Sequence, residues 1–137
     1  MTTRLNPYLA FQGPAREAME FYQSVFGGEL NVMTFGDMGG MGMPEESHGL
    51  VMHSDLMVND GVTLMGSDQP GDDAPVNGSV SLSGDDDATL RAWWAGLAEG
   101  GEVTLPLEVA PWGDAFGQLT DKFGIAWMFN IAGTPAA

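Results

Sequence analysis

The sequence contains one pattern twice, and this internal repeat limits the chain to folds built from two similar units. Residues 9–30 and 80–103 each run through an apolar strand, a glycine, a polar stretch, an amphipathic helix with an aromatic pair, a Gly-Gly pair and a second strand. The aromatic pairs are Phe21-Tyr22 and Trp93-Trp94. A period of about seventy residues exceeds that of solenoids and propellers, so it indicates a duplication. We therefore expect a pseudo-twofold α+β fold, and such folds tend to hold a pocket between their units.

The order of predicted elements is β-α-β-β-β in each half of the chain. We place module one at residues 5–68, a linker at residues 69–77 and module two at residues 78–133, within one domain. The first helix is predicted over residues 14–26, because its apolar residues recur at helical spacing. In module one the strands are expected over residues 8–11, 29–35, 50–58 and 62–65. In module two they are expected over residues 79–82, 102–108, 116–120 and 125–130, with a helix from the aspartates at 85–87 to residue 99.

The charge and composition argue against several classes of partner. Four Lys and Arg residues face nineteen Asp and Glu residues, a formal net charge of −15, so there are few cations to neutralise nucleic-acid phosphates or bind an anionic membrane. The chain has no cysteine, which excludes disulfides and thiolate ligands. No apolar stretch approaches the ~20 residues of a membrane span, and the N-terminus lacks a secretory signal. We expect a cytoplasmic protein without nucleic-acid or membrane partners.

Several short motifs together resemble a known family. They are Asn6-Pro7-Tyr8-Leu9, the helix end Phe26-Gly27-Gly28, His53 in its strand, and the closing run DKFGIAW at residues 121–127. In this order and spacing they resemble the vicinal oxygen chelate superfamily of glyoxalases, bleomycin-resistance proteins and dioxygenases, and most closely its PhnB-like branch. The resemblance implies two βαβββ modules that form a curved, mostly antiparallel sheet with outer helices. It also implies a homodimer, which would cover the open sheet edges.

Enzymes of this superfamily hold one divalent metal with His or carboxylate side chains from four strands. The resemblance assigns these four positions to Pro7, to Thr63 or Leu64, to Ser79 and to Met128. None of these is a good ligand for a transition metal. We therefore expect the inherited metal site to be absent and no cofactor to be required, with a relocated divalent metal as the alternative.

The remaining candidates for chemistry are two histidines, a few carboxylates and several aromatic residues. Ligand-binding candidates are Tyr8, Phe11, Phe35, His53, Asp68, Trp112, Phe116 and Trp127, and His53 and Asp68 are also the catalytic candidates. Apolar rings with a few polar groups are typical of a ligand cavity, although large aromatics also dominate ordinary cores. Asp68 is expected after the fourth strand, at a pocket mouth or in a turn. Asp121 is expected to cap the following turn.

Three functions are open from the sequence. The leading hypothesis is a small-molecule-binding protein without the superfamily metal. The alternative is a metal-dependent lyase, isomerase or dioxygenase with a relocated site, such as His53 with Asp68 or Glu108, or His48 with His53 and Asp55. The third is an interaction module that uses the Met- and Gly-rich loop 36–43, which is also suited to a lid or a dimer contact.

Overall fold

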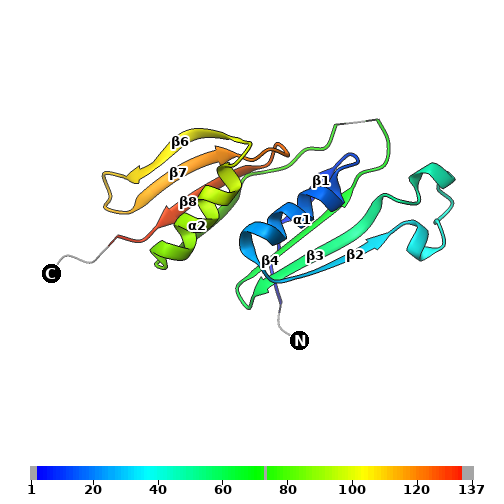
Figure 1. Ribbon diagram of the computed structural model, residues 1–137, viewed down its shortest axis with the longest axis horizontal. Coiled ribbons are helices and arrows are strands. Elements are labelled where there is room, and N and C mark those ends of the chain that lie inside the picture. The colour runs from blue at the N-terminus through cyan, green and yellow to red at the C-terminus, as the bar shows by residue number, and fades with distance from the viewer. Residues whose placement is uncertain (1–2, 73, 134–137) are drawn as a thin grey trace. The chain divides into compact units, whose positions relative to one another are not determined.

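The helices and strands follow the order β-α-β-β-β twice (Figure 1). The computed structural model describes residues 3–72 and 74–133. The first module comprises β1 Tyr8–Phe11, α1 Ala15–Phe26, β2 Glu29–Thr34, β3 Val51–Asn59 and β4 Val62–Asp68. The second comprises β5 Val80–Gly84, α2 Asp87–Ala98, β6 Glu102–Val109, β7 Ala115–Thr120 and β8 Ala126–Ile131. Two 3-10 helices, η1 Gly36–Met38 and η2 Glu45–Ser47, lie between β2 and β3. The predicted pair of βαβββ modules is confirmed.

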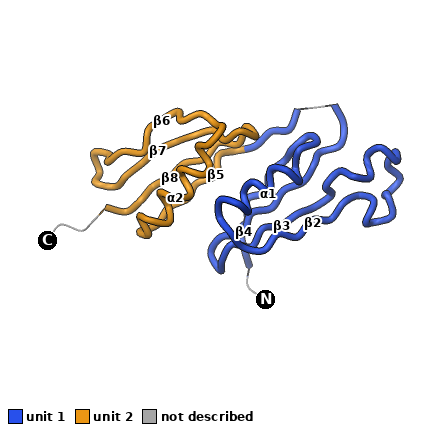
Figure 2. The backbone as a smooth tube through the Cα atoms, in the orientation of Figure 1, with its two compact units in different colours: residues 1–77 blue, residues 78–137 orange. Residues whose placement is uncertain are grey.

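The chain divides into two compact units, residues 1–77 and residues 78–137 (Figure 2). Each unit contains one module with its own four-stranded sheet and its own helix. The described residues of the predicted linker, 69–77, belong to no helix or strand and close the first unit.

In the first unit, α1 lies against one face of a sheet with strand order β1-β4-β3-β2. β1 runs parallel to β4, and the other neighbours are antiparallel. Leu64, Gly66 and Asp68 alternate with more exposed residues along β4, and the position of a Cβ on Gly66 is 3.2 Å from Met19 Sδ of α1. Buried residues of this sheet therefore point toward the helix. The opposite side, here called open face one, carries Tyr8, Asn31, His53, Asp55, Thr63, Met65 and Ser67.

The second unit repeats this arrangement with strand order β5-β8-β7-β6. Trp127, Phe129 and Ile131 of β8 are at most 2% exposed, and Phe129 makes an edge-on contact with Trp94 of α2. These side chains form the core beneath the helix. The opposite side, here called open face two, carries Ser81, Ser83, Phe116, Gln118, Met128 and Asn130.

The Gly-Gly pairs of the repeat have a steric reason. A side chain at Gly28 would collide with the backbone of Met57 on the neighbouring strand, and a side chain at Gly101 would collide with the backbone of Thr120. Each second glycine thus lets the strand after the helix approach its sheet closely. This shared requirement explains why both copies of the pattern end their helix with two glycines.

Two boundaries differ from the sequence prediction in ways that matter for the site. β4 extends to Asp68, whereas the prediction ended this strand at Met65. Pro14 is the N-cap of α1, and the helix itself begins at Ala15. The longer β4 comes from pairing with β1, where Phe11 lies opposite Asp68, and sequence patterning does not report such pairing between distant segments.

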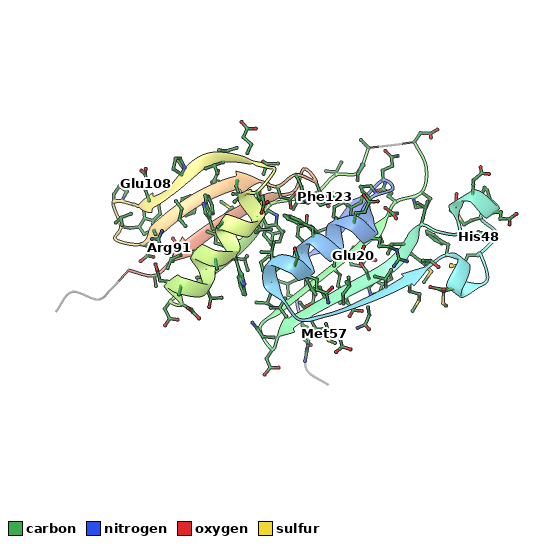
Figure 3. All side chains as sticks on the ribbon, viewed as in Figure 1. Glu20, His48, Met57, Arg91, Glu108 and Phe123 are labelled. Carbon is green, nitrogen blue, oxygen red and sulfur yellow. The ribbon has the colours of Figure 1, made fainter. Side chains whose placement is uncertain are left out.

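The Met- and Gly-rich loop 36–43 forms η1 and a series of turns that pack on His48. The His48 Nε2 atom is 3.1 Å from the carbonyl oxygen of Met43. A Cβ on Gly40, where φ is +81°, would lie 2.6 Å from the same nitrogen. His48 therefore holds the loop together. Figure 3 shows it beside this loop, away from Met57 near the end of β3.

Candidate functional site

Open face one contains a hydrogen-bonded pair, Tyr8 and His53, from strands that are not neighbours. Tyr8 lies on β1 and His53 on β3, with β4 between them. The Tyr8 hydroxyl oxygen is 3.0 Å from His53 Nδ1, and the ring centroids are 5.6 Å apart. Between these strands, β4 carries Met65, which lies opposite Tyr8, and Ser67, which lies opposite Ala10. Both Tyr8 and His53 are among the ligand-binding candidates named from the sequence.

Asp55 extends this pair on the other side of the imidazole. Its Oδ2 is 3.6 Å from His53 Nε2, an ion-pair distance, and its Oδ1 accepts a hydrogen bond of 3.1 Å from Asn31 Nδ2 of β2. The alternation of β3 predicts that His53 and Asp55 share a face, and the structure agrees. Asn31 was missed by the sequence analysis, because its partner is fixed by the register of β2 on β3.

An irregularity in the β2–β3 ladder lies next to His53. Met33 pairs with His53, but the next residue, Thr34, pairs with Val51, so Met52 is left without a partner in the register. Bulges of this kind re-aim side chains and occur often beside functional sites. Here the bulge allows Val51 to point into the core while His53 stays on open face one.

Open face two carries an exposed indole with fixed orientation. Trp112 is 61% exposed, and its ring meets that of Phe116 edge-on at 5.7 Å. The Trp112 Nε1–H donates to Asn130 Oδ1 over 3.4 Å, and Asn130 Nδ2 donates to Asp114 Oδ2 over 3.0 Å. A large apolar ring held in this way offers a flat surface on which an aromatic ligand can stack.

The same network acts on the carboxylate of Asp114. The hydrogen bond from Asn130, and then that from the Gly133 backbone N–H, hold the pKa of Asp114 below its usual 3.8. Because the folded-state pKa is the lower one, this group contributes stability above the unfolded-state pKa, and the contribution is lost as the pH falls through the folded-state pKa.

We expect Asn130→Ala to raise the pKa of Asp114 toward 3.8, because the largest stabilising hydrogen bond is removed. A titration of the side-chain carboxyl carbons by NMR measures this pKa directly. Asp37 is the internal control, since its lowered pKa arises from hydrogen bonds with Thr34 in the other unit. An Asp114 pKa that did not move would contradict the assigned network.

Asp68 does not follow the fourth strand, where a pocket mouth or a turn was expected. It is the last residue of β4 and is 3% exposed. Its Oδ1 accepts from the backbone N–H groups of Gly13 (2.8 Å) and Ala15 (3.0 Å), and its Oδ2 accepts from that of Val51 (2.9 Å). The carboxyl group therefore ties the β1–α1 turn, the start of α1 and the start of β3 to the end of β4.

Asp121 plays a similar part in the second unit and confirms its predicted role in the turn. Its Oδ1 accepts from the backbone N–H groups of Phe123 (2.8 Å) and Ile125 (3.1 Å). Its Oδ2 accepts from the indole Nε1–H of Trp127 over 2.8 Å. Asp121 is 3% exposed, so it also satisfies a polar group in the core.

Three of the aromatic candidates lie in the cores of their units. Phe11 is 3% exposed and points to α1, Phe35 is 9% exposed, and Trp127 is 2% exposed on the helix side of its sheet. Residue type alone did not separate these rings from Tyr8, Trp112 and Phe116. The structure places the last three on the open faces.

The residues that the resemblance assigns to the superfamily's metal positions are poor ligands for a transition metal. Thr63 lies on open face one and Met128 on open face two, whereas Pro7 and Ser79 immediately precede β1 and β5. Within the strands, Thr63 offers a hydroxyl and Met128 offers a thioether. None of these side chains is an imidazole or a carboxylate.

Two of the relocated sites considered from the sequence, both within the first unit, are also not assembled. His53 is on open face one, whereas Asp68 is buried on the helix side of the same sheet, so the two cannot share a metal ion. Across residues 3–72 and 74–133, no group of three or more His, Cys, Asp or Glu side chains is placed to hold one. This also applies to His48 with His53 and Asp55.

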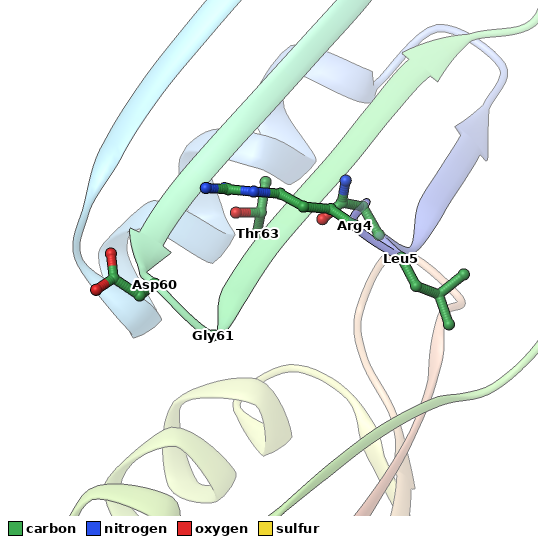
Figure 4. A pocket seen from close by; sticks show the side chains of 6 residues that line it. Arg4, Leu5, Asp60, Gly61 and Thr63 are labelled. Atoms are coloured by element: carbon green, nitrogen blue, oxygen red, sulfur yellow. The ribbon is translucent and has the colours of Figure 1, made fainter. Parts of the chain in front are cut away.

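Two hollows in the first unit lie outside the Tyr8–His53 pair. The smaller, about 180 Å³, is lined by Arg4, Leu5, Asn6, Asp60, Gly61 and Thr63, and Figure 4 shows Arg4 extended beside Thr63. The larger, about 410 Å³, is lined by Gln12, Gly13, Met43, Pro44, Ser47, Leu50, Gln69, Pro70 and Gly71. Met43 is the residue of loop 36–43 that contributes to it. The open faces are the better candidate sites, because polar groups there contact the exposed rings of Tyr8 and Trp112.

Comparison with known proteins agrees with this architecture. The profile of the Glyoxalase/Bleomycin resistance protein/Dioxygenase superfamily matches residues 4–129, and the chain belongs to this superfamily. Protein YjdN of Escherichia coli K12 is 30% identical over 141 residues, which cover 93% of this chain and 94% of that protein.

Solved structures show the same relationship. Protein PA1353 from Pseudomonas aeruginosa is 36% identical with a TM-score of 0.82, over 97% of this chain and 100% of that one. The PhnB protein from Bacillus cereus is 26% identical with a TM-score of 0.73, over 95% of this chain and 100% of that one. The resemblance to PhnB-like proteins is thereby confirmed. In the part of the chain that is described, no helix is long and apolar enough to cross a bilayer.

Proposed function

We propose that this protein binds a small, largely apolar or aromatic organic molecule and does so without the superfamily's metal. The observation that carries the proposal is Trp112, which is 61% exposed yet fixed by Phe116 and Asn130. Exposing a tryptophan ring to water costs free energy. A ligand that covers the ring removes this apolar surface from water and is stabilised by it.

The polar groups beside the exposed rings support the same proposal. On open face two, the Asn130 amide lies next to Trp112. Open face one, taken by itself, offers the Tyr8 hydroxyl. Ligand sites combine apolar surface with a few such groups. The poor donor set at the metal positions supports binding or metal-free chemistry over the alternative of a metal-dependent lyase, isomerase or dioxygenase. We also propose a cytoplasmic location and a homodimer. The dimer contact would cover Val103 and Leu105, which are 42% and 44% exposed on the edge strand β6.

A thermal-shift screen of small aromatic compounds tests the binding. A compound at about one hundred times its Kd is expected to stabilise the fold by about 2.7 kcal/mol. In Trp112→Ala we expect its Kd to rise at least about tenfold, which corresponds to the loss of about 1.4 kcal/mol of stacking.

Val109→Ala is the matched control, because Val109 is 75% exposed but pairs with Ala115, whose side chain points to the helix side of the sheet. It should leave the Kd unchanged. If no compound shifts the melting temperature, or if the shift is the same in Trp112→Ala, the proposal is wrong.

A further inference from the structure

We infer that loop 36–43 and His48 form a binding site for the monovalent copper ion, Cu(I). Its ligands are three thioethers and one imidazole nitrogen, namely those of Met38, Met41 and Met43 and Nδ1 of His48. The site lies in the first unit and uses none of the strand residues of open face one. It therefore goes beyond the proposed function and does not depend on it.

The loop presents sulfur atoms to solvent. Its methionines have the spacing Met-x2-Met-x-Met, at positions 38, 41 and 43. Met38 is 50% exposed, Met41 is 60% exposed, and Met43 lines the hollow of about 410 Å³, so an ion can reach them from solvent. Figure 3 shows sulfur atoms gathered at the end of the first unit where His48 is labelled. Thioethers are soft donors that select Cu(I), and the chain has no cysteine to supply a thiolate.

His48 is oriented as a metal-binding histidine is. Its Nε2 atom is 3.1 Å from the carbonyl oxygen of Met43. A carbonyl oxygen only accepts, so in the neutral ring Nε2 carries the proton and Nδ1 carries the lone pair that a metal needs. Metal-binding histidines almost always donate their other ring N–H in this way, which fixes the ring. Gly40 packs on the same edge, since a Cβ there would lie 2.6 Å from Nε2 and 2.7 Å from Cε1.

The backbone holds Met41 in a conformation that suits glycine. Its φ is +47°, between Gly40 at +81° and Gly42 at +75°. Backbone hydrogen bonds from Gly40 to Phe35 (2.7 Å) and from Met43 to Gly40 (2.8 Å) fix this turn. A residue with a Cβ adopts such a conformation at a cost in energy. A side chain that is 60% exposed contributes little to a core, so a role for the thioether itself explains a methionine at this position.

The charges around the loop favour a cation. η1 contains Asp37, and η2 begins with two glutamates. Hydrogen bonds with Thr34, and then the charge of Arg16, hold the pKa of Asp37 below 3.8, so this carboxyl group is ionised at neutral pH. The sequence has no Lys or Arg from residue 17 to residue 90. The negative field attracts cations in general, and the soft neutral ligands select the one that is retained.

The test is a competition for Cu(I) between the protein and a chromogenic Cu(I) chelator, under anaerobic and reducing conditions. We expect the wild-type chain to withdraw a single Cu(I) ion. In the double variant Met38→Leu/Met41→Leu, which keeps apolar side chains of similar size, the Kd for Cu(I) should rise at least about tenfold, the effect usual even for residues that only orient a metal ligand.

Met57→Leu is the matched control. Met57 is also exposed, at 43%, but it lies on β3 and away from His48 in Figure 3. Its loss should leave the Kd for Cu(I) at the wild-type value. If the wild type withdraws no Cu(I), or if the double variant and the control have the same Kd, the inference is wrong.

NMR with Ag(I), a soft monovalent ion that needs no reductant, locates the ligands. We expect Ag(I) to shift the Nδ1 resonance of His48 more than that of Nε2, and to shift the methyl carbons of Met38 and Met41 but not that of Met57. Zinc should leave the methionine methyl carbons in place, because thioethers do not retain it. Equal shifts at Met57, or a larger shift at Nε2, would mean adventitious binding only and would reject the site.

Discussion

Replacement of Asp68 by alanine is expected to lower the free energy of unfolding by about 3–5 kcal/mol, because two buried backbone N–H groups and one part-buried N–H group lose their acceptor at once. Those donors belong to Gly13, Ala15 and Val51. The loss would be a large part of the 5–15 kcal/mol that a domain typically has. If Asp68 instead served mainly as a ligand contact, its removal would leave stability nearly unchanged.

Urea denaturation followed by circular dichroism measures this change. Asp60→Ala is the matched control, since Asp60 lies exposed in the turn between β3 and β4, and a change within about 0.5 kcal/mol is expected there. Asp68→Asn, which keeps one carbonyl oxygen, should fall between the two. A loss below about 1 kcal/mol in Asp68→Ala would refute the assigned role.

Trp127→Ala is expected to cost about 3–5 kcal/mol, the usual effect of deleting a buried aromatic side chain. Its indole is 2% exposed, and its N–H donates to Asp121, so the variant creates a cavity and also removes a partner of that carboxylate. Trp112→Ala provides the contrast, because Trp112 is 61% exposed and its loss should cost less than about 1 kcal/mol.

The two tryptophans therefore have opposite expected profiles. Trp127→Ala should destabilise the fold, whereas Trp112→Ala should keep the fold and lose the ligand. Thermal denaturation of both variants, with and without the aromatic compound found in the screen, gives the comparison. A Trp127→Ala variant as stable as the wild type would show that this ring does not stabilise the core.

Much of the architecture follows from sequence patterns because those patterns are local. The spacing of Ala18 and Tyr22 in α1 predicts the buried side of the helix, and both residues are fully buried. The Gly-Gly pairs mark the helix ends because of the close approach that follows them. The alternation of β3 places His53 and Asp55 on one face.

The parts that could not be predicted depend on contacts between distant segments. Asp68 was expected after β4, at a pocket mouth or in a turn, because its partners are 17 to 55 residues away and leave no local signal. Trp127 and Trp112 are chemically identical, and only the register of β8 on β7 puts the first beneath the helix. The bond between Tyr8 and His53 spans 45 residues and crosses a strand. Such contacts leave no signal in composition or periodicity.

In both units the contacts that hold the fold lie on the helix side of the sheet or at its ends, where Asp68 and Asp121 are buried. The open faces have meanwhile acquired different residues: Tyr8, His53 and Asp55 on one, and Trp112, Phe116 and Asn130 on the other. The repeat indicates a duplication, and with this division each copy can accept substitutions on its open face without loss of foldability. The architecture separates selection for stability from selection for recognition, so the two halves are free to evolve different specificities.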